Sequence, residues 1–204
     1  YIDNKIYSTL YKFKEILMII NPKQLLSLLL IFLGFVSFSS INAAEVPKTM
    51  EYQESKLILN GQGTRVKFFM KVYDTSLYLK SSSNDAEKIL NDDEVMAIRL
   101  DVTSTLVTVA AMQDALNEGL IKSTGDNTGP ISNEINQLTL SFSTDVSDGD
   151  FFEFIYIPDT GIDILKNSAL IDTIPGIEFK KAFFGIWLSN NPIQKNLKKD
   201  MLGG

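Results

Sequence analysis

The chain has 204 residues, of which 45% are hydrophobic and 22% charged, a composition typical of one globular domain with additional segments. It contains no histidine and no cysteine. This excludes Ser-His-Asp and Cys-His nucleophiles, histidine ligands for metal or haem, disulfide bonds and a lipoprotein cysteine. The net charge of −6 makes nucleic acid an unsuitable partner.

The first 43 residues differ from the rest, and we expect them to be two separate segments. Residues 1–17 precede Met18 and lack signal-like character, so they are interpreted as an upstream extension. Residues 18–43 are interpreted as a secretory signal peptide. Their apolar run, Leu25–Phe38, has 14 residues, which suits a signal peptide and is short for a membrane span. The alternative is an uncleaved membrane anchor.

Cleavage after Ala43 leaves residues 44–204 as the expected mature domain, located in the periplasm and without stable membrane insertion. This part has 15 basic and 23 acidic residues, a net charge of −8. Such a domain is a poor partner for nucleic acid and for anionic membranes. No internal repeat or linker is visible, so we expect one domain.

The first predicted element is a β-ribbon from Lys56 to Leu79. A strand, Lys56–Leu59, runs into Asn60-Gly61, which is a strong turn signal because both residues tolerate positive φ. A long strand then carries an arginine into an apolar run. Period-2 alternation predicts one face turned to the core, made of Val66, Phe68, Met70 and Val72. It predicts a second, mixed face, made of Arg65, Lys67, Phe69, Lys71 and Tyr73.

The later elements follow from hydrophobic periodicity and turn signals. The predicted helices are Asp85–Leu90 with Asn84 as its cap, Thr105–Lys122, Ile131–Phe142, Ile177–Leu188 and a terminal helix after Pro192. The predicted strands are Glu94–Val102, Phe151–Ile157, and a hairpin of Ile162–Lys166 and Ala169–Ile174. This order favours an α+β fold with a mainly antiparallel sheet covered by helices.

Several segments, in this order, resemble the chalcone isomerase-like family. They are LNGQGTRVKFFMKVYDTSLYL (Leu59–Leu79), Asn117-Glu118-Gly119, Gly149-Asp150, Pro158 with Gly161, and IPGIEFKKAFFGIWLSNNP (Ile174–Pro192). The resemblance covers Leu57–Gly203 and is to the small bacterial exported branch of the chalcone isomerase and fatty-acid-binding superfamily. It implies an open-faced β-sandwich, in which a large antiparallel sheet is backed by helices around a ligand cleft.

The resemblance also implies candidate site residues. In the family's fatty-acid binders an arginine and a tyrosine thirteen residues later grip the carboxylate, and Arg65 and Tyr78 have this spacing. In the enzymes the same arginine stabilises charge during ring closure, and Asn117 is matched to one of their helper residues. The predicted helix Thr105–Lys122 contains no tyrosine, which argues against cyclisation chemistry.

The residues themselves add a composition argument and leave alternatives open. Arg65 is one of two arginines against 17 lysines, and a guanidinium in such a chain suggests bidentate recognition of a carboxylate. The alternatives are an Arg65 paired with a surface carboxylate, a Tyr78 in the core, and an Asn117 bonded to the sheet.

Three functions follow. The favoured one is a non-catalytic periplasmic binding protein for a fatty acid or similar amphipathic carboxylate, gripped by Arg65 and Tyr78 with its tail in an apolar cleft. The second is an isomerase, an intramolecular lyase in which Arg65 and Tyr78 are catalytic. The third is a ligand-free partner protein in a cell-envelope system. None of the three requires a metal or a cofactor.

Overall fold

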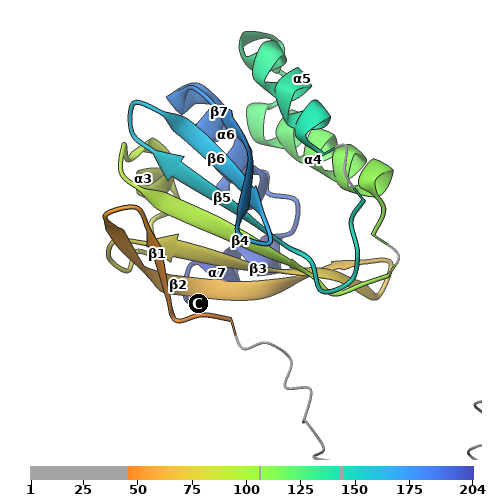
Figure 1. Cartoon of the computed structure of the whole chain (residues 1–204), viewed down its shortest axis with the longest axis horizontal. Helices are drawn as coiled ribbons and strands as arrows, with labels where there is room; N and C mark the ends of the chain where they lie inside the picture. The colour runs from red at the N-terminus through yellow and green to blue at the C-terminus, as the bar shows by residue number, and fades with distance from the viewer. Residues whose placement is uncertain (1–45, 106, 143–144) are drawn as a thin grey trace, which may run out of the picture. The chain divides into compact units, whose positions relative to one another are not determined.

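A seven-stranded antiparallel sheet, with strand order β1 to β7, organises the structure (Figure 1). This computed structural model describes residues 46–105, 107–142 and 145–204, so the predicted upstream extension and signal peptide lie outside the described residues. The strands are β1 (Thr49–Tyr52), β2 (Ser55–Lys67), β3 (Met70–Leu79), β4 (Met96–Val102), β5 (Phe151–Ile157), β6 (Gly161–Lys166) and β7 (Ala169–Ile174).

Five α-helices of the described chain contribute to one core on a single face of this sheet. They are α3 (Ala86–Asn91), α4 (Val109–Thr124), α5 (Ser132–Ser141), α6 (Ile177–Leu188) and α7 (Lys195–Met201), with a 3₁₀ turn at Gly129–Ile131. Figure 1 shows α6 behind the sheet, and α4 and α5 beside it. The predicted α+β class, with an antiparallel sheet backed by helices, is confirmed.

Local signals placed most elements correctly. In β4 the side chains of Met96, Ile98, Leu100 and Val102 enter the helix-side core, as their alternation predicts. The helix α4 begins later than expected, because the Thr108 side chain accepts a hydrogen bond from Ala111 N and caps it. It ends at Gly125, whose φ of 59° suits a left-handed cap.

The β2–β3 hairpin differs from its prediction. Strand β2 continues through Asn60 and Gly61, where a bulge absorbs one residue, and a second bulge follows Arg65. The turn is instead at Phe68-Phe69, where both residues have positive φ. The predicted core-facing set was therefore wrong for three of its four residues: Val66, Phe68 and Met70 are exposed, because the alternation was read through a turn, whereas Val72 packs against the core.

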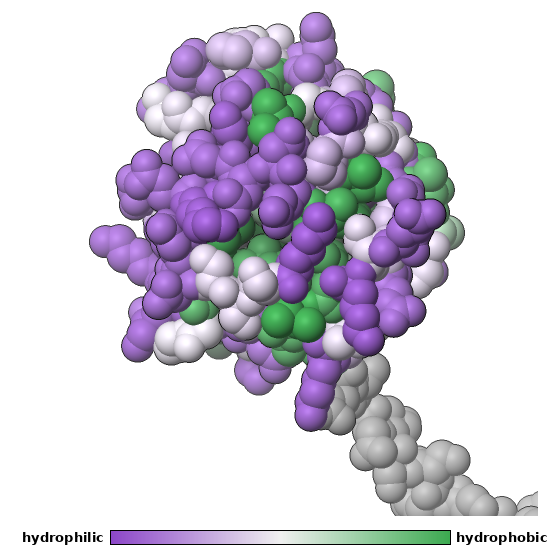
Figure 2. All heavy atoms as spheres, turned by 90° about the vertical axis from the view of Figure 1, so that its left-hand side faces the viewer, coloured by the Kyte–Doolittle hydropathy of each residue, from purple (hydrophilic) through white to green (hydrophobic). Residues whose placement is uncertain are grey.

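The other face of the sheet carries a smaller apolar cluster, made of Met50, Leu57, Tyr78, Ala97, Ile155 and Leu165. Beside it, Arg99 pairs with Asp101 and Glu153 and lies 3.8 Å from the centre of the Phe151 ring. Figure 2 shows the side of the molecule at the left of Figure 1, where apolar side chains are framed by hydrophilic ones. Within the described ranges, no helix is long and apolar enough to span a bilayer.

Candidate ligand-binding site

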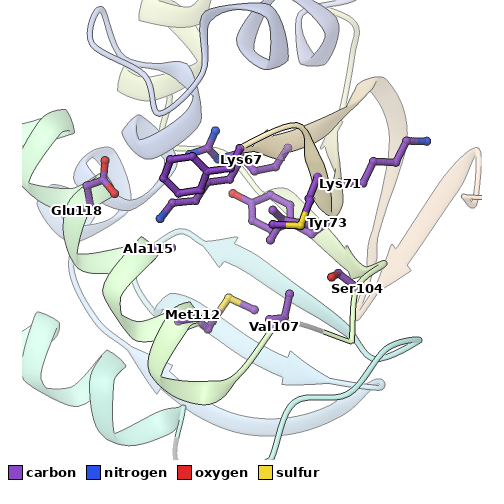
Figure 3. Close-up of a pocket in the computed structure, with 13 residues that line it drawn as sticks. Lys67, Lys71, Tyr73, Ser104, Val107, Met112, Ala115 and Glu118 are labelled. Atoms are coloured by element: carbon purple, nitrogen blue, oxygen red, sulfur yellow. The ribbon is translucent and has the colours of Figure 1, made fainter.

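A cavity of about 160 Å³ lies between the β2–β3 hairpin and helix α4 (Figure 3). Its apolar wall consists of Phe68, Met70, Val72, Val107, Ala111, Met112 and Ala115. Its polar and charged residues are Arg65, Lys67, Lys71, Tyr73, Ser104 and Glu118. A cavity of ~150 Å³ holds a benzene-sized ligand, and typical ligand sites reach roughly 300–1,000 Å³. A polar head and the first carbons of a chain therefore fit, and a longer chain requires the hairpin and α4 to separate.

Arg65 and Tyr73 form a cross-strand pair in the wall of this cavity. Arg65 of β2 lies opposite Tyr73 of β3, so both side chains project from the helix-covered face. Tyr73 is buried, and Figure 3 shows its hydroxyl directed into the space between the hairpin and α4. The site thus brings a guanidinium and a phenol together at an apolar wall.

The Tyr73 hydroxyl also contacts helix α6. It accepts a hydrogen bond from Trp187 Nε1, with 3.3 Å between the nitrogen and the oxygen. Burial raises the pKa of Tyr73, while the Trp187 N–H and the Arg65 guanidinium act against that rise. The hydroxyl is therefore protonated at neutral pH. Because the bond from Trp187 uses one of its lone pairs, its own proton can be donated to a ligand oxygen.

Gln194, just before helix α7, holds the Arg65 side chain. Arg65 Nη1 donates to Gln194 Oε1 at 3.0 Å and to the Val66 carbonyl oxygen at 2.9 Å. The Gln194 side chain is itself fixed by bonds to Val66 N and to the Thr64 carbonyl oxygen. Both bonds from Arg65 pass through Nη1, and no carboxylate in the described part of the chain forms an ion pair with it. The guanidinium is thus oriented by neutral partners and not by an ion pair among the described residues.

The charges around the cavity favour an anion. Arg65, Lys67 and Lys71 line it, and its one carboxylate, Glu118, already forms an ion pair with Lys122 at 2.7 Å. The pKa of Glu118 is lowered, first by its bond to Lys122 and also by the nearby positive charges of Lys67 and Arg65. A positive cavity in an acidic chain attracts anionic ligands locally.

The structure places the three predicted site residues in three different environments. Arg65 lines the cavity. Tyr78 lies on the opposite face of the sheet, fully buried, and donates to the Pro47 carbonyl oxygen at 2.8 Å. Asn117 is exposed and borders a separate small void between α4 and α5. The structure therefore does not bring Tyr78 or Asn117 to Arg65, whether as ligand contacts or as catalytic partners.

Tyr78 and Asn117 lie away from Arg65 because of the direction in which successive side chains point along a strand and around a helix. Tyr73 and Tyr78 are five residues apart on one strand, an odd number, so they point to opposite faces. The bulge at Asn60 moves Arg65 to the Tyr73 face, while Leu59, opposite Tyr78, stays on the other. On α4, Asn117 follows Ala115 by two positions and so lies around the helix from the cavity.

Three site residues were missed from the sequence: Tyr73, Gln194 and Trp187. The alternation had already placed Tyr73 on the mixed face with Arg65, and both line the cavity, but Tyr73 was not assigned a role in binding because the pair Arg65 and Tyr78 was preferred. Nothing local marks Gln194 or Trp187, which reach the site by tertiary packing. Among the described residues, no group of three or more acidic side chains is arranged to hold a metal ion.

Comparison with known proteins supports the description of the fold. A family model described as "Chalcone isomerase-like" matches residues 38–203. The crystal structure of an Arabidopsis thaliana fatty-acid binding protein superposes with a TM-score of 0.62 at 14% sequence identity, covering 77% of this chain and 90% of the plant protein. No curated protein matches the chain significantly.

Proposed function

Because this chain belongs to the chalcone isomerase-like family, we propose that its cavity binds a fatty acid or a similar amphipathic carboxylate without chemical conversion. The observation that carries the proposal is the cross-strand pair of Arg65 and Tyr73 beside an apolar wall. Similarity to a fatty-acid binding protein adds support at the level of the fold.

The pair suits a carboxylate in its chemistry. A guanidinium and a phenol O–H both donate, and a carboxylate only accepts. Each charge-assisted bond contributes about 1.5–3 kcal/mol when shielded from water. Each buried CH₂ group adds on the order of 0.8 kcal/mol, so the chain supplies affinity while Arg65 and Tyr73 determine which end enters the cavity.

The chain's single tryptophan provides the assay, because Trp187 donates to the Tyr73 hydroxyl. A fatty acid titrated into the purified protein should change Trp187 fluorescence with saturation. Arg65→Gln should weaken binding by roughly 10- to 150-fold, equivalent to the loss of one charged bond. A fatty alcohol of the same length should bind Arg65→Gln and the wild type about equally, because it has no carboxylate.

A matched pair of tyrosine variants tests which face holds the ligand. Tyr73→Phe removes a hydroxyl inside the cavity, and Tyr78→Phe removes one from the opposite face. Only Tyr73→Phe should weaken fatty-acid binding. Equal affinity of Tyr73→Phe and the wild type would remove this residue from the site, and saturable binding lost only in Tyr78→Phe would overturn the proposal.

We also infer that the protein works in the periplasm. The support is sequence alone: the apolar run Leu25–Phe38 followed by small residues. Cell fractionation and intact-mass measurement should find a periplasmic species beginning at Ala44. A cytoplasmic species that retains residues 18–43 would contradict this.

A further inference from the structure

The turn of the β2–β3 hairpin exposes aromatic side chains to solvent. Phe68 is 79% exposed and Phe69 is fully exposed. Of the eight large apolar side chains that are exposed in the described part of the chain, four fall within Val66–Met70. Apolar exposure of this density marks an interaction surface more often than scattered single residues do.

Backbone preference explains phenylalanine at neither position, and of the two only Phe68 lines the cavity. Lys67 and Met70 pair across the turn, so Phe68 and Phe69 are its two central residues. Their φ values of 49° and 66° define a left-handed turn that favours Asn-Gly. The hairpin would form more easily without the aromatic pair, and the cavity does not account for Phe69 or for the exposed part of the Phe68 ring, so the pair presents an apolar surface to something outside the fold.

Basic residues surround the turn. Lys67 and Lys71 flank the aromatic pair, and Lys67 Nζ lies 5.9 Å from the centre of the Phe68 ring. No acidic residue occurs from Arg65 to Tyr73, although the whole chain has a net charge of −6. Because charges are screened beyond about 8 Å at physiological salt, the local positive charge dominates at the turn.

We propose that this turn docks the protein on an anionic lipid bilayer, with Phe68 and Phe69 in the interfacial region and Lys67 and Lys71 at the phosphates. Aromatic rings favour the membrane interface, and lysines extend along apolar surface to reach head groups. The acidic remainder of the protein is repelled by the same surface, so docking occurs turn first. This local charge reverses the expectation drawn from composition.

Docking in this orientation would present the cavity to the lipid. Phe68, Met70, Lys67 and Lys71 belong both to the hairpin end and to the cavity wall. An amphipathic carboxylate could then pass between bilayer and cavity with little exposure of its chain to water. This consequence rests on the proposed function, but docking itself does not require a ligand.

Vesicle flotation tests the proposal with phosphatidylcholine vesicles, with or without phosphatidylglycerol. The wild type should float with the anionic vesicles only, and less so as salt is raised. Phe69→Gly and the double variant F68N/F69G should lose at least about tenfold in apparent affinity, because the apolar contact is removed. K67Q/K71Q should lose the salt dependence. Leu140→Ser, a 74% exposed apolar residue on α5, is the matched control and should float like the wild type.

The F68N/F69G variant also shows whether a loss of flotation could come from misfolding. Asn-Gly suits the left-handed turn, so this variant should unfold at the same or a higher temperature than the wild type. Flotation of F68N/F69G equal to wild type, or no flotation of wild type, would overturn docking. Wild-type self-association in solution that F68N/F69G abolishes, without flotation, would assign the turn to a second copy instead. Fatty-acid binding without vesicles, read from Trp187, succeeds or fails separately and tests the proposed function alone.

Discussion

Gly61→Ala should displace helix α7 from strand β2, because α7 lies directly on the backbone at this glycine. A Cβ atom at residue 61 would stand 2.3 Å from the Asp200 carbonyl oxygen and 2.6 Å from that of Met201. Both are backbone atoms, so no side-chain rotation relieves the contact. The helix must move by about 1 Å to restore normal separations, which loosens the packing of the core residue Met201.

The magnitude follows from three contributions. Overpacking of this kind costs roughly 1–3 kcal/mol. Displacement of α7 also breaks the 2.9 Å bond from Asn60 Nδ2 to the Met201 carbonyl oxygen, worth about 0.5–1.5 kcal/mol. Replacing glycine by alanine also reduces the conformational freedom of the unfolded chain, which stabilises the folded protein by about 0.4–1 kcal/mol. The net loss in the free energy of unfolding should be about 2 kcal/mol, or roughly 4–8 °C in Tm for a domain of this size.

Urea unfolding of a graded glycine series measures this. Gly63→Ala should cost less, because its Cβ would meet side-chain atoms at 2.8–2.9 Å, and two of these, Asp200 Oδ2 and Leu197 Cδ1, lie at the movable ends of their side chains. Gly129→Ala, with open space around it, should be as stable as the wild type. Fatty-acid affinity should fall only in Gly61→Ala, because moving α7 displaces Gln194 from Arg65. Equal urea midpoints for Gly61→Ala and Gly129→Ala would refute the reasoning.

Three further predictions concern charge. Burial lowers the pKa of Lys180 to about 8, partly offset by Asp92 and Asp93, and its Nζ donates to three carbonyl oxygens at the end of α3. The folded protein thus releases this proton before the unfolded chain does, so stability should rise from about pH 8 toward pH 10 in urea unfolding. Burial raises the pKa of Tyr78 to about 12, so stability should fall again above pH 10. Lys180→Met should abolish this rise in stability between about pH 8 and pH 10. If the rise persists in Lys180→Met, another titrating group causes it. Gln194→Glu should lower fatty-acid affinity more than Gln194→Met does. The new carboxylate at position 194 would bind the Arg65 guanidinium in place of the carboxylate of the fatty acid. The reverse order of affinities would mean that Arg65 does not receive the fatty-acid carboxylate.

Local sequence signals were sufficient for the C-terminal half of the fold. Strand β5, strand β7 and helix α6 have the predicted bounds, Phe151–Ile157, Ala169–Ile174 and Ile177–Leu188. Each rests on short-range information: alternation in β5, the Asn167-Ser168 turn with positive φ at both residues, and a Pro-Gly pair before α6. The sequence alone also singled out Arg65, because a rare guanidinium among lysines indicates a special role.

Only the tertiary structure decided which residues join Arg65. The choice between Tyr73 and Tyr78 depends on the register of β2 against β3, which two bulges change. A shift of one residue reverses the face of every following side chain, and no local pattern reveals a bulge. Gln194 is 129 residues from Arg65 in the chain and reaches it through the packing of α7 on β2. Sequence therefore determined the class of fold and one residue of the cavity, whereas packing and register assembled the candidate site around it.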